Sequence, residues 1–228
     1  MWYYPERPEI AALVPETARV VLDVGCGDGA LGRMLKRARP GIVVLGIEPL
    51  PEVAAIAREH LDAIRVGGAE EGWPSDWPMP DCIVFADSLE HMLDPWSVLA
   101  RSVERLAPGG SVVLSLPNVT HYSLLVGGLR GRWDYADCGL LDRTHLRFFT
   151  RLTLLELLRG AGLEPTSIGR VCSDRWTRRL VYRYGQARRW LTGDDRSGHA
   201  ERASIMDVLT YQYLVVARRP ATAANPAG

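Results

Sequence analysis

The sequence lacks the signals of several protein classes. Its four cysteines lie far apart and form no C-x-x-C pair, so neither a zinc site nor a disulfide framework is indicated, and we expect no bound metal. No apolar run approaches the about 20 residues that a membrane span needs. The N-terminus also lacks the basic-then-apolar order of a signal peptide. We therefore expect a soluble protein in a reducing cytoplasm.

The sequence also has no excess of positive or negative charge. The chain carries 27 basic and 27 acidic residues, so its composition does not favour nucleic acid or an anionic membrane surface as the main partner. Only Lys36 is a lysine, which we attribute to the coding bias of a GC-rich genome. At 228 residues with 47% hydrophobic content, the chain can bury a full core and is expected to form one α/β domain.

The residues that are present are organised around a glycine-rich stretch near the N-terminus. Val20 to Val24 form a short apolar, β-branched run that predicts a buried strand. Three glycines follow at alternate positions: Gly25, Gly27 and Gly29. Leu31 and Leu35 then recur at helical spacing. A strand, a glycine turn and a helix N-terminus together predict a nucleotide-binding corner, although such a turn can also serve only to pack a strand on a helix.

Two acidic residues indicate which nucleotide this corner binds. Asp23 precedes the first glycine by two residues, where a carboxylate suits the ammonium and sulfonium of an aminoacyl nucleotide better than a pyrophosphate. Glu48 ends the next apolar run, residues 42–48, about 20 residues after the turn, where such an acid accepts hydrogen bonds from ribose hydroxyls. Glu48 could instead cap the helix that Pro49 begins, and the two roles are compatible.

The glycine turn with its preceding acid resembles motif I of the class I S-adenosylmethionine (SAM) dependent methyltransferases. Residues 86–91, which follow an apolar strand, and the sequence Leu-Ala-Pro-Gly-Gly at 106–110 strengthen this resemblance, which covers residues 3 to about 165. It implies an α/β, Rossmann-like fold with a seven-stranded, mostly parallel sheet and an antiparallel last strand. It also implies SAM as cofactor and S-adenosylhomocysteine (SAH) as product.

The resemblance assigns a cofactor site from several segments of the chain. The expected residues are Asp23, Gly25, Cys26, Gly27, Gly29, Glu48, Pro49, Ala69, Glu70, Asp87, Ser88, Leu89, Tyr3 and Arg7. Gly68 departs from the family pattern, because an aspartate usually contacts the adenine there; the backbone near Ala69, or Glu70, would take that role. Tyr3 and Arg7 belong to residues 1–19, which we interpret as a lid over the cofactor or, alternatively, as an apolar flap over one helix.

Residues 118–149 leave the minimal nucleotide fold and are dense in polar and aromatic groups. Long connections in compact domains are often functional lids, so we predict an insertion on the acceptor side, the alternative being a surface excursion held by its own aromatics. The stretch from Asp142 to Thr150 resembles one in bacterial methyltransferases found with glycosyltransferase and polysaccharide genes. Its first part, Asp142 to His145, resembles ubiquinone-type O-methyltransferases, in which a histidine lies beside the acceptor. We expect His145, its tautomer fixed by Asp142, to act as general base or to orient the acceptor. His121 is a second candidate, and His145 could instead only tie the cover to the following helix.

The remaining assignments concern domain limits and the reaction. We expect a methyltransferase domain over residues 20–219, with a divergent helical segment at 173–205 and a disordered tail at 220–228. The arginine-rich residues 170–189 could bind substrate or form a homodimer, or could be a helical hairpin with snorkelling arginines. The expected reaction is methyl transfer from SAM to a hydroxyl of a sugar or polar natural product. The alternatives are a small-molecule N-methyltransferase, a protein that binds SAM or SAH without catalysis, and an NAD-dependent oxidoreductase.

Overall fold

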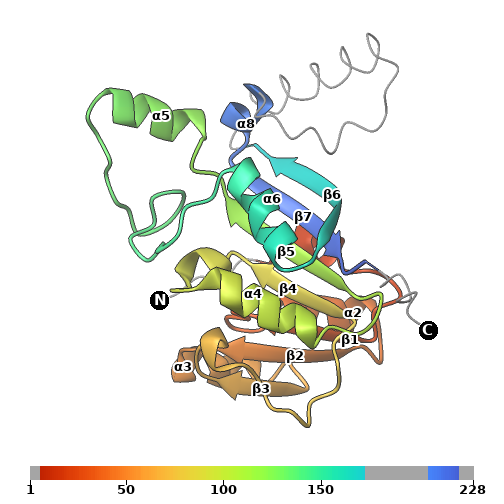
Figure 1. The fold of residues 1–228 in the computed structure, drawn as a ribbon. Coiled ribbons are helices and arrows are strands. Elements are labelled where there is room, and N and C mark those ends of the chain that lie inside the picture. Colours follow the sequence, from red (N-terminus) through yellow and green to blue (C-terminus); the bar gives the residue numbers. More distant parts are fainter. Residues whose placement is uncertain (1–5, 173–204, 221–228) are drawn as a thin grey trace, which may run out of the picture.

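A seven-stranded sheet forms the centre of the molecule (Figure 1). The computed structural model describes residues 6–172 and 205–220. The strands are β1 (Val20–Val24), β2 (Val43–Glu48), β3 (Ala63–Val66), β4 (Cys82–Ala86), β5 (Ser111–Pro117), β6 (Glu164–Val171) and β7 (Gln212–Arg218), in the order β3-β2-β1-β4-β5-β7-β6. β7 is antiparallel to β5 and β6, and the pairs among β1 to β5 are parallel. The predicted sheet is confirmed.

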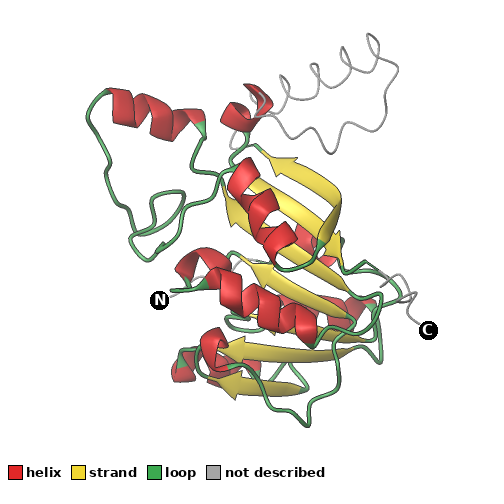
Figure 2. Cartoon of the chain, in the orientation of Figure 1, coloured by secondary structure: helices red, strands yellow, loops and turns green. Residues whose placement is uncertain are grey.

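Helices cover both faces of this sheet (Figures 1 and 2). They are α1 (Pro8–Ala11), α2 (Ala30–Ala38), α3 (Pro51–Ala57), α4 (Pro95–Glu104), α5 (Tyr122–Leu129), α6 (Arg151–Gly160) and α8 (Ile205–Leu209), with 3-10 turns η1 (Ala69–Glu71) and η2 (Leu89–His91). Alternate residues of each strand enter two separate cores, as a period of two requires. Leu22 packs with α4 and α6, whereas Val21 packs with α1 and α2. None of the described helices is long and apolar enough to span a membrane.

The helix starts follow the capping residues of the sequence. The Asp94 side chain accepts a hydrogen bond from the Ser97 amide at 3.1 Å, and Pro95 occupies the first turn of α4. Thr150 caps α6 in the same way, by accepting from the Thr153 amide at 3.2 Å. The loops after β4 and β5 lie at the carboxyl edge of the sheet because these two strands are parallel neighbours.

The insertion at residues 118–149 leaves the sheet after β5 and returns to it before α6. It contains α5, which the sequence did not predict and which stands apart from the sheet in Figure 1. The Val119 amide donates to the Phe149 carbonyl at 2.9 Å, which closes the base of the insertion. Tyr3, the residues 173–204 and the tail from 221 lie outside the described residues, and with them most of the arginine-rich segment 170–189 for which we gave a substrate or dimer role as one possibility. Its first arginine, Arg170, belongs to β6 and pairs with Asp207 at 3.4 Å.

Candidate active site

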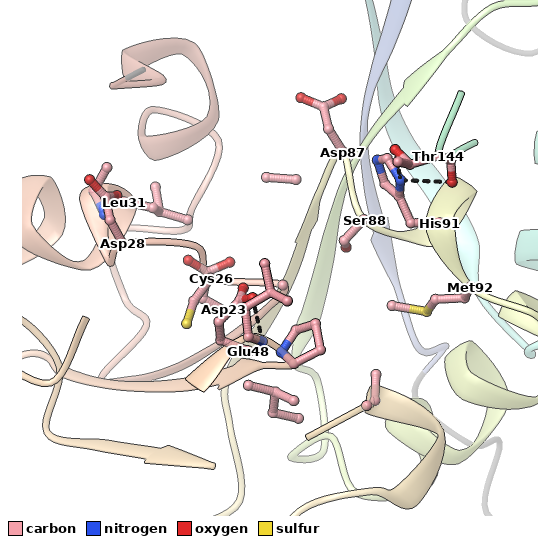
Figure 3. Close-up of a pocket in the computed structure, with 18 of the residues that line it drawn as sticks. Asp23, Cys26, Asp28, Leu31, Glu48, Asp87, Ser88, His91, Met92 and Thr144 are labelled. Atoms are coloured by element: carbon pink, nitrogen blue, oxygen red, sulfur yellow. Dashed lines mark hydrogen bonds between the residues drawn. The ribbon is translucent and has the colours of Figure 1, made fainter. Parts of the chain in front are cut away.

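A cavity of about 650 Å³ opens at the carboxyl ends of β1, β2 and β4. The sheet order places β1 beside β4, so the strand order reverses between them, and open α/β sheets bind their ligands at such a point. The volume lies in the range of about 300 to 1,000 Å³ that is typical of small-molecule sites. Figure 3 shows Asp23 and Glu48 on one side of this cavity and Asp87, Ser88 and His91 on the other.

The glycine turn lies close to the neighbouring strands. The amides of Gly25 and Cys26 donate to the Ile47 carbonyl at 2.9 and 3.0 Å, which draws the turn onto the end of β2. Gly25 has a φ of +79°, and a Cβ built there would lie 2.7 Å from the Ser88 Cβ. Only glycine combines this backbone conformation with so close an approach, so the wall of the cavity is bare backbone at this point.

Two buried carboxylates face the cavity from the ends of β1 and β2. Asp23 is 2% exposed, and its Oδ1 has no hydrogen-bond partner among the described residues. Burial, and then the charge of Glu48, raise the pKa of Asp23 to about 7. Burial also raises the pKa of Glu48, although its Oε2 and Oε1 accept from the Gly27 and Leu50 amides, each at 3.0 Å. Such a pair favours a ligand that brings a cation to Asp23 and hydroxyl donors to Glu48, as the ammonium and ribose of SAM do.

Asp87 is fixed at the opposite wall by three side chains. It has a φ of +55°, which is unusual for a residue with a Cβ. Arg7 and Gln212 both donate to its carboxylate, and the Ser115 hydroxyl donates at 2.8 Å. The structure thus brings Arg7 into the cavity wall as a partner of Asp87. The expected contact of Arg7 with the cofactor carboxylate stays a prediction.

The acceptor-side candidates do not all reach the cavity. His91, Asp142 and Thr144 line it, and the Thr144 hydroxyl donates to Asp142 at 2.6 Å. His145 lies behind His91, with 4.8 Å between the ring centroids, and burial lowers its pKa together with the charge of His91. His121 is 2% exposed at the start of α5, and its Nδ1 accepts there from the Ser123 amide at 3.4 Å.

The other predicted cofactor residues also fall into two groups, those that line the cavity and those that do not. Those that line the cavity are Gly25, Cys26, Pro49, Ala69, Glu70, Asp87 and Ser88. Those that do not are Gly27, Gly29 and Leu89. Gly27 holds Glu48 through its amide, Gly29 caps α2 with a φ of +81°, and Leu89 is fully buried in the core. Their expected contact with the cofactor stays a prediction.

Sequence reasoning missed several lining residues. They are Asp28, Leu31, Leu50, Met92 and Thr144, among others. Asp28 could have been found, because it stands between two glycines of the turn that the sequence singled out. No local signal marks Met92 or Thr144, since their position depends on how the insertion returns to η2.

Comparison with known proteins agrees with this geometry. A family model described as a methyltransferase domain matches residues 5–168, and the chain belongs to this family. The ubiquinone biosynthesis O-methyltransferase of Xanthomonas axonopodis pv. citri is 32% identical over 179 residues, which cover 74% of this chain and 72% of that protein.

Solved structures show the same fold. A SAM-dependent methyltransferase of Thermotoga maritima, described as a possible histamine N-methyltransferase, has a TM-score of 0.61 at 18% identity and covers 92% of this chain and 86% of its own. The plantazolicin methyltransferase BamL, in complex with a triazolic desmethylPZN analogue and SAH, has a TM-score of 0.59 at 15% identity, covering 89% and 77%. The protein is therefore a class I SAM-dependent methyltransferase, and SAM is its cofactor.

Proposed function

We propose that the protein transfers the methyl group of SAM to a hydroxyl of a small polar acceptor, such as a sugar or a polar natural product. One observation carries this proposal: a single cavity joins the carboxylates of Asp23 and Glu48 to the polar side chains of His91, Asp142 and Thr144. The first pair suits the cofactor, and the second group suits an acceptor with several hydroxyls. The 32% identity to an O-methyltransferase supports oxygen as the nucleophile.

The chain contributes mainly by positioning its two ligands. Asp23 holds the ammonium and Glu48 the ribose, so that the methyl group faces the side chains after β4. Asp142 and Thr144 receive the acceptor, and His145 orients its hydroxyl or accepts its proton. Holding two reactants in line in this way accounts for a large part of the rate in such reactions, because it removes the entropy cost of bringing them together.

Labelled methyl transfer tests this proposal. The enzyme is incubated with SAM carrying a deuterated methyl group and with two panels of acceptors, one of hydroxylated compounds including sugars and catechols, the other of small amines. We expect the label on an oxygen of a hydroxylated compound, identified by mass spectrometry and NMR. Label only on nitrogen would support the alternative, an N-methyltransferase, which the similarity to a possible histamine N-methyltransferase favours.

Replacing Glu48 by alanine tests the ribose contact. The two ribose hydroxyls would lose a charged acceptor, so we expect the affinity for SAH to fall by about 1 to 3 kcal/mol in a calorimetric titration. Glu52→Ala is the matched control, because Glu52 is exposed on the neighbouring helix α3. If Glu48→Ala binds SAH as tightly as the unchanged protein, Glu48 is not a ribose ligand.

The insertion at residues 118–149 is proposed as a cover over the acceptor. Its helix α5 exposes apolar side chains, with Leu129 89% exposed, while Thr144 at its far end lines the cavity. We expect limited proteolysis to cut the free protein within this insertion, and SAH together with a methylated acceptor from the labelling experiment to slow that cut. Cutting in the proline-rich loop 72–80 serves as the internal control. Equal rates with and without ligands would count against a cover.

A further inference from the structure

A second cluster of charged and ligating side chains lies beside the acceptor end of the cavity. It consists of Glu90 and His91, both from η2, and His145 from the insertion. One potential ligand atom from each residue lies within 4.8 Å of the other two. The proposed function uses His91 as a polar group of the cavity and His145 to orient the acceptor or accept its proton, and it assigns Glu90 no role.

Glu90 is a buried carboxylate that forms no salt bridge with any of the described residues. It is 1% exposed, and its Oε2 has no hydrogen-bond partner among the described residues. The positive charge of Arg7 acts on Glu90, but Arg7 is itself bound to Asp87, as are Ser115 and Gln212. Burying a carboxylate oxygen without a partner is costly, so this position favours a bound cation.

Hydrogen bonds to backbone carbonyls fix the tautomer of both histidines. The Nδ1 of His91 lies 3.2 Å from the Thr144 carbonyl oxygen, and the Nδ1 of His145 lies 3.3 Å from the Leu140 carbonyl oxygen. Because a carbonyl oxygen only accepts, each Nδ1 carries the hydrogen and each Nε2 carries the lone pair. Histidines that bind metal ions are fixed in this way, with the other ring nitrogen donating to a backbone carbonyl.

Backbone hydrogen bonds hold the three residues together without an ion. The Glu90 carbonyl accepts from the Leu146 and Arg147 amides at 2.8 and 3.0 Å, so the residue that follows His145 is anchored directly on Glu90. The Thr144 hydroxyl also lies 3.1 Å from the His91 Nδ1, a contact drawn in Figure 3. The cluster is thus assembled by the fold, with His91 on its exposed side and Glu90 on its buried side.

We infer that Glu90, His91 and His145 bind a divalent transition-metal ion, which holds an oxygen of the acceptor; this inference rests on the proposed O-methyltransferase function. Two imidazoles and one carboxylate suit Zn²⁺, Mn²⁺, Fe²⁺ or Co²⁺ better than Mg²⁺, and three protein ligands leave positions open for substrate. Tetrahedral metal–ligand bonds of about 2.0 to 2.2 Å place ligand atoms about 3.3 to 3.6 Å apart. The three ligand atoms here lie up to 4.8 Å apart, so the exposed His91 has to rotate toward the other two to close the site. The expectation of no metal rested on cysteine spacing, and this cluster uses no cysteine.

The ion would act on the acceptor hydroxyl. A hydroxyl bound to a divalent cation has a lowered pKa and gives its proton to solvent water. An electron pair of the resulting oxygen forms the bond to the methyl carbon as the carbon–sulfur bond breaks. The electron pair of that bond stays on sulfur, which leaves neutral SAH, and the ion is unchanged. In this arrangement His145 acts on the acceptor through the ion.

Titration with Co²⁺ tests the site without an acceptor. The full-length protein is freed of metal with EDTA, dialysed, and titrated by calorimetry and by visible absorption, which reports imidazole ligation. We expect one site per chain, with Mg²⁺ bound at least about tenfold more weakly. Glu90→Gln and His145→Gln should each weaken Co²⁺ at least about tenfold and change its spectrum. His60→Gln, a histidine outside the cluster, controls for metal bound at other imidazoles.

A titration with SAH in the presence of EDTA distinguishes a failure of the metal inference from a failure of the proposed cofactor site. If SAH binds but Co²⁺ does not, or if all variants bind Co²⁺ like the unchanged protein, the metal inference is overturned while the methyltransferase function stands. If Co²⁺ binds at the cluster but SAH does not bind, the cofactor site fails instead. His91→Gln covers the case of a misfolded variant, because His91 is exposed and its replacement leaves the core intact; it should weaken Co²⁺ by a similar factor.

Discussion

Asp23→Asn is expected to abolish most of the affinity for SAH and, at the same time, to stabilise the ligand-free protein near pH 8. Removing one partner of a buried, hydrogen-bonded charge pair costs about 2 to 5 kcal/mol, so affinity should fall about thirtyfold or more. The physical reason is that the Asp23 Oδ1 is buried and has no partner among the described residues, which leaves the ammonium of the ligand as its counter-charge.

The stability effect follows from the pKa of the same carboxyl group. Burial raises it from 3.8 to about 7, so the folded state holds the proton more tightly than the unfolded chain. The protonated Asp23 carboxyl therefore contributes to the stability of the folded state. This contribution is complete below about pH 4 and is lost as the pH rises through about 7. Above that pH a buried charge remains, and the difference between the two pKa values corresponds to at most about 4 kcal/mol. Asparagine carries no such charge.

Urea unfolding of the ligand-free protein at pH 5 and pH 8 measures how much the free energy of unfolding depends on the Asp23 charge. The unchanged protein should lose more stability between the two values than Asp23→Asn, and the variant should be the more stable of the two at pH 8. Asp28→Asn, in the same turn but only half-buried, controls for the substitution itself. If the free energy of unfolding changes equally with pH in both proteins and Asp23→Asn binds SAH unaltered, then the Asp23 pKa is not raised by burial and Asp23 is not a cofactor ligand.

His145→Gln is expected to lower turnover about a hundredfold or more while leaving the affinity for SAH within about twofold, since loss of such a group typically costs a factor of 10² to 10⁴. The ring has its Nδ1 on the Leu140 carbonyl and packs against His91, which lines the cavity. His145 does not itself line the cavity, so its Nε2 is expected to reach the acceptor hydroxyl past His91 or through a bound ion. Asp23 and Glu48, which are expected to bind the cofactor, lie on the other side of the cavity from His91, so SAH binding should not change.

His121→Gln is the matched comparison, because the sequence put forward both histidines. His121 is buried at the start of α5 and packs on Tyr122 and Tyr211, neither of which lines the cavity, whereas His145 packs on His91, which does. The His121→Gln variant should therefore keep most of the turnover if it folds and binds SAH. Initial rates with a saturating acceptor and SAH titrations of both variants decide between them. Loss of turnover in His121→Gln but not in His145→Gln would reverse the assignment.

The cofactor half of the site was readable from the sequence because it is built from local signals. The strand at Val20 to Val24 has the predicted bounds, and the glycine turn follows it directly. Glu48 ends β2 and Asp23 is the last residue but one of β1, and parallel neighbours bring such strand ends to one edge of the sheet. Sequence spacing alone therefore placed both carboxylates at the same cavity.

The acceptor half could not be read in this way. The closeness of Glu90 to His145 depends on two backbone hydrogen bonds between η2 and the end of the insertion, residues far apart in the chain. Neither periodicity nor a motif encodes such a return. The sequence indicated His145 through the imidazole pKa, the nearby Asp142 and a resemblance, and it included Glu90 in the motif at 86–91 without assigning it a role. The helix α5 was missed for a related reason: its residues are apolar around most of the helix and include Gly127 and Gly128, so they show no clear helical period.

The central claim is that the cavity beside Asp23 and Glu48 is a SAM site, and calorimetric titration with SAH and with NAD in the same buffer tests it most directly. We expect one SAH per chain, no heat of binding with NAD, and loss of the SAH signal in Asp23→Asn. The last result ties binding to this cavity. Tight binding of NAD with none of SAH would contradict the account.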